Sequence, residues 1–240
     1  MDIKIAYLYY DLMNLYGERG NINVLVETFK QQDINVSVTE LSLNDKIDFN
    51  YYDLYVIGSG TESNQKRVLE DLKKYKDKIK DSIENGKFFL CTGNSIELFG
   101  KTIKDDDNIY EGLDIFDYDT IYKDRIVCEV LFRCELIEDY ILGFQNQGGS
   151  IDNYEFNLFD VLSGIGSHIG SKKEGIHYKN FYATYVIGPI LARNPKFLEK
   201  FVIDIILDKN SNYRYKTFDL KLDKDAQDNF IKLYHPDYYE

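Results

Sequence analysis

The stretch Leu90–Gly100 reads LCTGNSIELFG, and it lies where an apolar strand runs directly into a helix. The residues just before it, KFF at 87–89, continue the apolar run that is typical of a strand buried on both faces. A sharp turn from strand to helix can present a nucleophile at the edge of a sheet. The identity of the residue at this turn therefore decides what chemistry the chain can perform.

Working outward from this turn, strands and helices alternate along the first half of the chain. IKIAYLYY at 3–10 and LYVIGSG at 54–60 are near-continuous apolar strands, and INVSVTEL at 34–41 is a more polar, alternating strand. Apolar residues with helical spacing follow at 22–29 and 68–83. This alternation predicts an α/β fold, in which helices cover both faces of a mostly parallel sheet.

The second half continues with strand-like runs and one clear helix. The runs are RIVCEVLF at 125–132, YILGFQN at 140–146 and FYATYVIG at 181–188. Asn194 is placed to cap a helix that begins at Pro195, where the missing proline N–H is harmless.

The chain shows no interdomain linker and no internal repeat. We expect one domain over residues 1–210 and an extension over 211–240, which packs on the domain or trails from it. The extension is polar and carries a short helix near 226–233.

Composition narrows the function further. The 240 residues carry a net charge of -12, which repels phosphate backbones and argues against nucleic-acid binding. No apolar run is long enough to span a membrane, and we expect a cytoplasmic protein. Cys91, Cys128 and Cys134 lack the spacing of a disulfide framework or a zinc site, so we expect no metal and no cofactor.

In a parallel sheet the functional residues follow the carboxyl ends of the strands. Gly58 and Gly60 follow one strand, and their backbone N–H groups could converge on an anion. A helix that opens near Asn94 would add the positive end of its dipole. The alternative is that both glycines serve only to turn the chain.

Four segments resemble one known family. They are YYDLMNLYGERGNINVL at 9–25, GSGTESNQ at 58–65, GFQNQGG at 143–149 and ATYVIGPILARNP at 183–195. Together they are similar to class I glutamine amidotransferases of the cobyric acid synthase type. Within that type they most resemble the small glutaminase subunit of the lipid II isoglutaminyl synthase. The resemblance implies a flavodoxin-like three-layer sandwich with a mostly parallel central sheet.

The resemblance also implies a reaction and a partner. In that family the subunit hydrolyses glutamine, and a partner related to Mur ligases uses the ammonia to amidate a glutamate of the cell-wall precursor. The reaction needs a cysteine at the strand-to-helix turn, a histidine that activates it and two backbone N–H groups for the oxyanion.

This chain departs from the family at both reactive positions. Counted without gaps from Gly100, Gly93 takes the place of the nucleophilic cysteine, and Glu97 takes the place of a glutamine. Ile187 stands where the family has its histidine, and an isoleucine cannot accept a proton. Glycine tolerates the backbone angles of the turn, so the shape can persist without the nucleophile. We therefore predict a subunit without glutaminase activity.

An active enzyme is the alternative reading. Cys91 could serve as the nucleophile if the turn carried a two-residue insertion, with an unrecognised base. On the ungapped register it lies inside the strand as a small buried residue. His168, His177 and His235 do not fall on the family's histidine position.

The rest of the pocket has also changed. In the 143–149 segment the family's glutamate and histidine correspond to Gln145 and Gln147, which carry no charge. The predicted ligand pocket comprises Gly58, Gly60, Asn94, Glu97, Gln145 and Asn146. Because main-chain N–H groups survive side-chain substitution, we expect a residual site for a small carboxylate or for glutamine.

Overall fold

The computed structural model describes residues 1–238 and contains two sheets. The main sheet has six strands in the order β11-β12-β4-β3-β1-β2. Every neighbouring pair is parallel except β11 with β12, which confirms the predicted mostly parallel sheet. Its strands are β1 (Asp2–Leu8), β2 (Asn35–Leu41), β3 (Leu54–Ile57), β4 (Phe88–Thr92), β11 (Ile176–Tyr178) and β12 (Phe181–Thr184).

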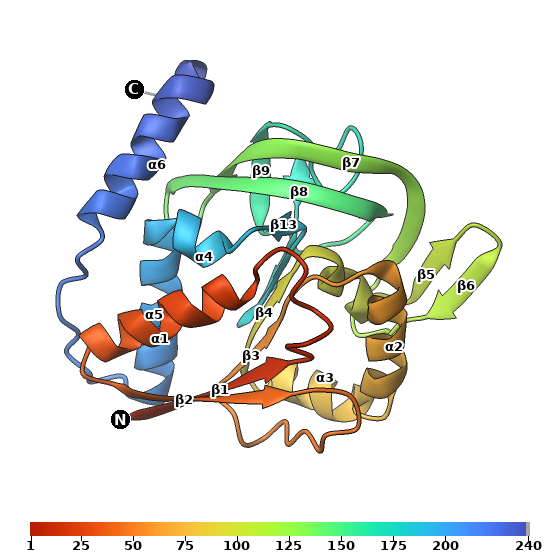
Figure 1. Ribbon diagram of the computed structural model, residues 1–240, viewed down its shortest axis with the longest axis horizontal. Coiled ribbons are helices and arrows are strands. Elements are labelled where there is room, and N and C mark those ends of the chain that lie inside the picture. Colours follow the sequence, from red (N-terminus) through yellow and green to blue (C-terminus); the bar gives the residue numbers. More distant parts are fainter. Residues whose placement is uncertain (239–240) are drawn as a thin grey trace.

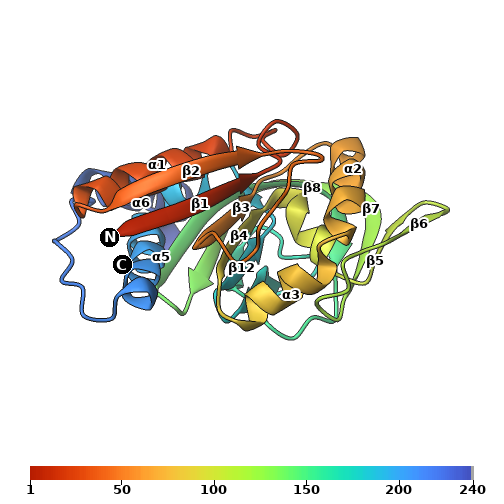
Figure 2. The same cartoon turned by 90° about the horizontal axis from the view of Figure 1, so that it is seen from below.

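Helices cover both faces of this sheet, so that the domain has three layers (Figures 1 and 2). α1 (Arg19–Gln31) and α5 (Pro195–Lys209) share one apolar core with one face of the strands. α2 (Glu62–Lys73) and α3 (Lys76–Glu84) share a second core with the other face. The short helix α4 (Ile190–Arg193) joins the strand β13 (Val186–Ile187) to α5. The apolar faces predicted at 22–29 and 68–83 are buried, but the single helix expected over 68–83 is divided into α2 and α3 at Lys74–Tyr75.

A second sheet arches over the carboxyl ends of the main strands (Figure 1). Its two long antiparallel strands contain the predicted strand runs at 125–132 and 140–146, but the sheet itself was not predicted. β13 follows β12 of the main sheet directly and pairs with β8, so it links the two sheets. Its strands are β5 (Thr102–Asp105), β6 (Asn108–Glu111), β7 (Asp119–Cys134), β8 (Asp139–Ile151), β9 (Phe159–Ser163), β10 (Lys173–Glu174) and β13 (Val186–Ile187).

The C-terminal extension forms a helix that packs on the second sheet. α6 (Lys221–Tyr234) is longer than the predicted 226–233 and is followed by the turn η2 (Pro236–Tyr238). Its Ile231 packs with Leu131 and Leu142. Lys224 also pairs with the buried Asp139 at 2.9 Å. The extension is therefore docked on the fold, although the boundary at residue 210 stays a prediction.

None of the helices within residues 1–238 combines the length and the apolar character that crossing a bilayer requires.

Candidate functional site

The turn after β4 is centred on Gly93. Its φ is 61°, a left-handed value that glycine adopts without strain, as the ungapped register predicts. The helix expected after the strand is present and begins at Gly93; it is the 3-10 helix η1 (Gly93–Phe99). All of its residues are buried beneath the second sheet, and this packing favours a short, tight turn of helix.

Two side chains fill the space beside Gly93. A Cβ atom built on Gly93 would lie 2.3 Å from Ser59 Oγ and 2.9 Å from Ile187 Cγ2. Both distances are too short for atoms that are not bonded to each other. Ile187 therefore faces the turn across the pocket, as predicted, and Ser59 occupies space that any side chain at residue 93 would need.

Strand pairing brings these positions together. β12 lies beside β4 in parallel, with Thr184 opposite Thr92, so the segments that follow both strands emerge at the same edge. The turn at Gly188, with φ 70°, follows Ile187 directly. β3 pairs with the other side of β4, which places Ser59 next to the same edge.

The two backbone donors predicted for an anion already have partners. Gly60 N–H donates to Asn94 Oδ1 at 3.0 Å, and Asn94 N–H donates to Ser59 Oγ at 3.4 Å. Asn94 Nδ2 donates in turn to Gly60 O at 2.9 Å. Gly58 has a different role, because a Cβ there would lie 2.3 Å from the carbonyl oxygen of Met13. A ligand anion at this turn would have to displace Asn94 or Ser59.

Glu18 is a buried carboxylate directly behind the turn. It accepts hydrogen bonds from Thr92 Oγ1 at 2.5 Å, from Asn21 Nδ2 at 3.2 Å and from Gly188 N–H at 3.2 Å. Desolvation by burial raises its pKa, although two of these donors oppose the shift. The side chain thus ties the segment before α1 to the ends of β4 and β13. The sequence segment 9–25 contains Glu18, but its role could not be derived from spacing.

Glu97 is fully buried and does not line a cavity. Gln65 Nε2 donates to its Oε2 at 2.6 Å and Tyr122 OH donates at 3.0 Å, whereas its Oε1 has no partner among the described residues. Gly149 packs so closely that a Cβ there would lie 2.3 Å from Oε1. Burial raises the pKa of Glu97 to about 7. The predicted pocket residue therefore lies behind the pocket wall, where it supports Tyr122.

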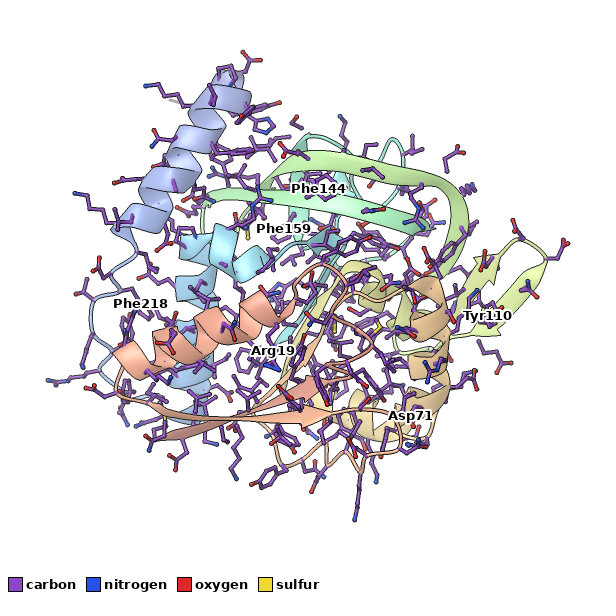
Figure 3. All side chains as sticks on the ribbon, in the orientation of Figure 1. Arg19, Asp71, Tyr110, Phe144, Phe159 and Phe218 are labelled. Carbon is purple, nitrogen blue, oxygen red and sulfur yellow. The ribbon has the colours of Figure 1, made fainter. Side chains whose placement is uncertain are left out.

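A cavity of about 40 Å³ lies between the turn and the second sheet. Of the six predicted pocket residues, Gly60, Asn94 and Asn146 line it. Gln145 does not; its side chain is buried on β8, where Cys128 Sγ approaches its Oε1 at 3.8 Å. A more open cleft of about 490 Å³ adjoins the cavity at Leu15 and is flanked by Arg19, which is labelled in Figure 3.

Sequence reasoning missed the charged groups of this cavity. Arg125 lines it and donates to Asn146 Oδ1 at 2.9 Å. Its other nitrogen pairs with Glu62, the first residue of α2. Arg125 lies within the irregular register between Tyr122 and Ile126, and an irregularity of this kind has no signature in a single sequence.

Cys91 and the three histidines occupy different surroundings. Cys91 is buried in β4 within the core on the α2 side, and burial raises its thiol pKa. A thiol in that environment is a poor nucleophile. His168 faces Asp152 at 3.4 Å, the His177 ring packs against Tyr182 in the main sheet, and His235 follows α6. The interactions that the structure records pair none of them with Cys91.

The buried carboxyl of Glu97 predicts a pH-dependent stability. Its pKa is about 7 in the folded chain and about 4.5 when exposed, so the unfolded chain loses this proton first as the pH rises. As the pH rises from about 4.5 to about 7, this group therefore lowers the free energy of unfolding by up to roughly 3 kcal/mol. We expect Glu97→Gln to remove that loss and to gain stability relative to the native chain as the pH rises.

Urea unfolding of both proteins at pH 4.5 and pH 8 measures this difference. Glu174, also buried with a pKa raised to about 7, is unchanged in the variant and cancels in the comparison. A stability difference that does not change with pH would contradict the prediction.

Comparisons with known proteins agree with this architecture. Residues 4–195 match the CobB/CobQ-like glutamine amidotransferase domain. A solved structure described as a glutamine amidotransferase superposes with a TM-score of 0.55 over 84% of this chain and 97% of its own, at 11% sequence identity. The likeness to that structure concerns the fold alone.

Two curated proteins are similar over nearly the whole chain. The lipid II isoglutaminyl synthase (glutamine-hydrolyzing) subunit GatD of Staphylococcus aureus is 32% identical over 94% of this chain and 92% of its own. The subunit of the same name from Streptococcus pneumoniae is 30% identical over 86% of this chain and 82% of its own. The chain therefore belongs to the family of CobB/CobQ-like glutamine amidotransferase domains.

Proposed function

We propose that this chain is a non-catalytic, glutamine amidotransferase-like subunit that serves an amide-forming enzyme of cell-wall precursor synthesis. One observation carries the proposal: the strand-to-helix turn, where the family resemblance places the nucleophile, holds Gly93, and Ser59 and Ile187 fill the space beside it. The names of the two curated relatives support the pathway. The presence of an intact fold around the altered turn supports a retained binding role.

The chemistry of glutamine hydrolysis explains why these changes matter. Hydrolysis proceeds through attack on the amide carbon, and it needs a nucleophile, a proton acceptor and donors for the oxyanion. Gly93 has no side chain, Ile187 has no lone pair, and the N–H groups of Gly60 and Asn94 already have acceptors. All three requirements are unmet at the turn.

The partner in this proposal is a Mur-ligase-like protein, and the chain acts in the cytoplasm as its stabilising or regulatory subunit. Copurification of the tagged chain with a candidate Mur-ligase-like protein from the same organism tests this part. We expect a stable complex, and a ligase that is less soluble or less active without the subunit.

Steady-state glutamine hydrolysis tests the lack of activity. We expect ammonia release no faster than the reaction without protein, both alone and with the candidate partner. The Staphylococcus aureus relative named above serves as the positive control. Turnover by this chain that is abolished by Cys91→Ala would establish the alternative, an active enzyme that uses Cys91.

The cavity supports a ligand as part of the same role. Among the described residues that line it, Arg125 is the only cationic side chain, and a small carboxylate or glutamine could replace Glu62 as its partner. Calorimetric titration with glutamine, glutamate and acetate tests this part. We expect weak binding that Arg125→Ala abolishes. An absence of binding at millimolar concentrations would remove the ligand from the proposal and leave only the role as a partner subunit.

A further inference from the structure

We infer that the anion-binding turn of this site is preserved and that the side chain of Asn94 occupies it as an internal ligand. Asn94 Oδ1 accepts from the backbone N–H of Gly60 at 3.0 Å and from the hydroxyl of Ser59 at 3.2 Å. One carboxamide oxygen therefore meets a backbone donor and a side-chain donor, as the oxygen of a bound carboxylate would.

Four hydrogen bonds close this arrangement. Asn94 Nδ2 donates to Gly60 O at 2.9 Å, and Asn94 N–H donates back to Ser59 Oγ at 3.4 Å. Ser59 is 2% exposed and Asn94 is 9% exposed, so water has little access to these bonds. A buried N–H left without an acceptor costs about 1–3 kcal/mol. The turn therefore needs an acceptor, and Asn94 supplies it in every folded molecule.

The surroundings define the ligand that could replace Asn94. The cavity of about 40 Å³ borders Ser59, Gly60 and Asn94, so removal of the carboxamide would enlarge it beside the freed donors. The freed donors would be the Gly60 N–H and the Ser59 hydroxyl, which both point to the place of Asn94 Oδ1. Donors that converge on one point in this way can bind a small anion. A carboxylate such as acetate has the size and the acceptors that this space requires. This inference deepens the proposed function and rests on it, because a subunit that does not bind an oxyanion can fill the site permanently.

Acetate provides the probe, and Asn94→Ala provides the variant. We expect sodium acetate, compared with sodium chloride at equal ionic strength, to shift the ¹⁵N–¹H signal of Gly60 in Asn94→Ala. The dissociation constant should be at least tenfold lower than in the native chain. Asn94→Asp keeps an acceptor in front of Gly60, so we expect it to bind acetate no better than the native chain.

Asn180→Ala is the matched control, since Asn180 Nδ2 also donates to a glycine carbonyl, Gly86 O, at 2.7 Å in a remote turn. It should be destabilised without gaining acetate binding. If Asn94→Ala does not fold, Ser59→Ala is the second variant. It frees only the N–H of Asn94, and acetate should then shift the signal of Asn94 and leave that of Gly60 in place.

Equal acetate binding by the native chain and by Asn94→Ala would overturn the inference, because Asn94 would then not be an occupant. A folded Asn94→Ala in which acetate leaves the Gly60 signal unmoved would overturn it as well. Neither result depends on glutamine hydrolysis, so the failure of this inference is distinguishable from the failure of the proposed function.

Discussion

Glu18→Ala is expected to lower the free energy of unfolding by about 3 kcal/mol. The substitution leaves Thr92 Oγ1, Asn21 Nδ2 and Gly188 N–H without their shared acceptor in a buried site. Removing the carboxylate also relieves its own desolvation, which keeps the net loss below the sum of three broken hydrogen bonds. Urea unfolding followed by circular dichroism measures the loss.

Two control variants show whether the loss comes from the buried hydrogen bonds of Glu18. Glu18→Gln keeps the shape of the side chain and one acceptor, so we expect a smaller loss than for alanine. Glu27→Ala removes an exposed glutamate of α1 that pairs with Lys30, and it should change stability by less than about 0.5 kcal/mol. A Glu18→Ala protein as stable as Glu27→Ala would show that Glu18 does not hold the three segments together.

The second large effect concerns the recovery of glutaminase activity. We expect Gly93→Cys with Ile187→His to be nearly inactive, although it introduces the two reactive groups at the positions that the family resemblance assigns to them. The new Cβ would lie 2.3 Å from Ser59 Oγ and 2.4 Å from Ser59 Cβ, so the cysteine or its neighbours must move. A misplacement on the order of 1 Å can cost roughly a hundredfold in rate.

Adding Ser59→Gly should raise kcat/KM by about a hundredfold over the double variant. The third substitution makes room for the cysteine and frees the N–H of Asn94, which the oxyanion needs. Glu97→Gln should add little, because the carboxyl of Glu97 faces Gln65 and Tyr122 and not the cavity. Coupled detection of glutamate formation, with each single variant as control, measures these differences.

Robust turnover by the double variant alone would contradict this expectation. It would show that the pocket is still built for glutamine and that only the reactive groups were lost. The alkylation rate of the new cysteine by iodoacetamide, measured with and without Ser59→Gly, separates a misplaced thiol from a missing oxyanion site.

Much of the main sheet could be predicted because its signals are local. Apolar runs and helical spacing placed β1 to β4 and the helices between them, and the ungapped register placed Gly93 at the turn. The role of Ser59 could not be predicted, because it depends on the distance between two loops that meet only when β3 pairs with β4. Ser59 itself looks like an ordinary loop residue.

The second sheet escaped prediction for a related reason. β7 and β8 form a hairpin of consecutive strands, whereas β5 bypasses β6 to pair in parallel with β7, and β13 joins β8 from more than thirty residues along the chain. The pattern identified the strand runs within β7 and β8 but not their partners. The pocket residues Arg125 and Gln147 depend on that pairing, and this is why the predicted pocket was incomplete.

The packing around Gly93 has a consequence for the routes by which this sequence could change. Cysteine at 93 meets Ser59, and histidine at 187 alone would serve no nucleophile. Neither substitution alone would therefore produce activity, and the cysteine at 93 would also be destabilising because of its clash with Ser59. A reactive pair would therefore need two or more substitutions together, and changes in surface residues do not alter that requirement.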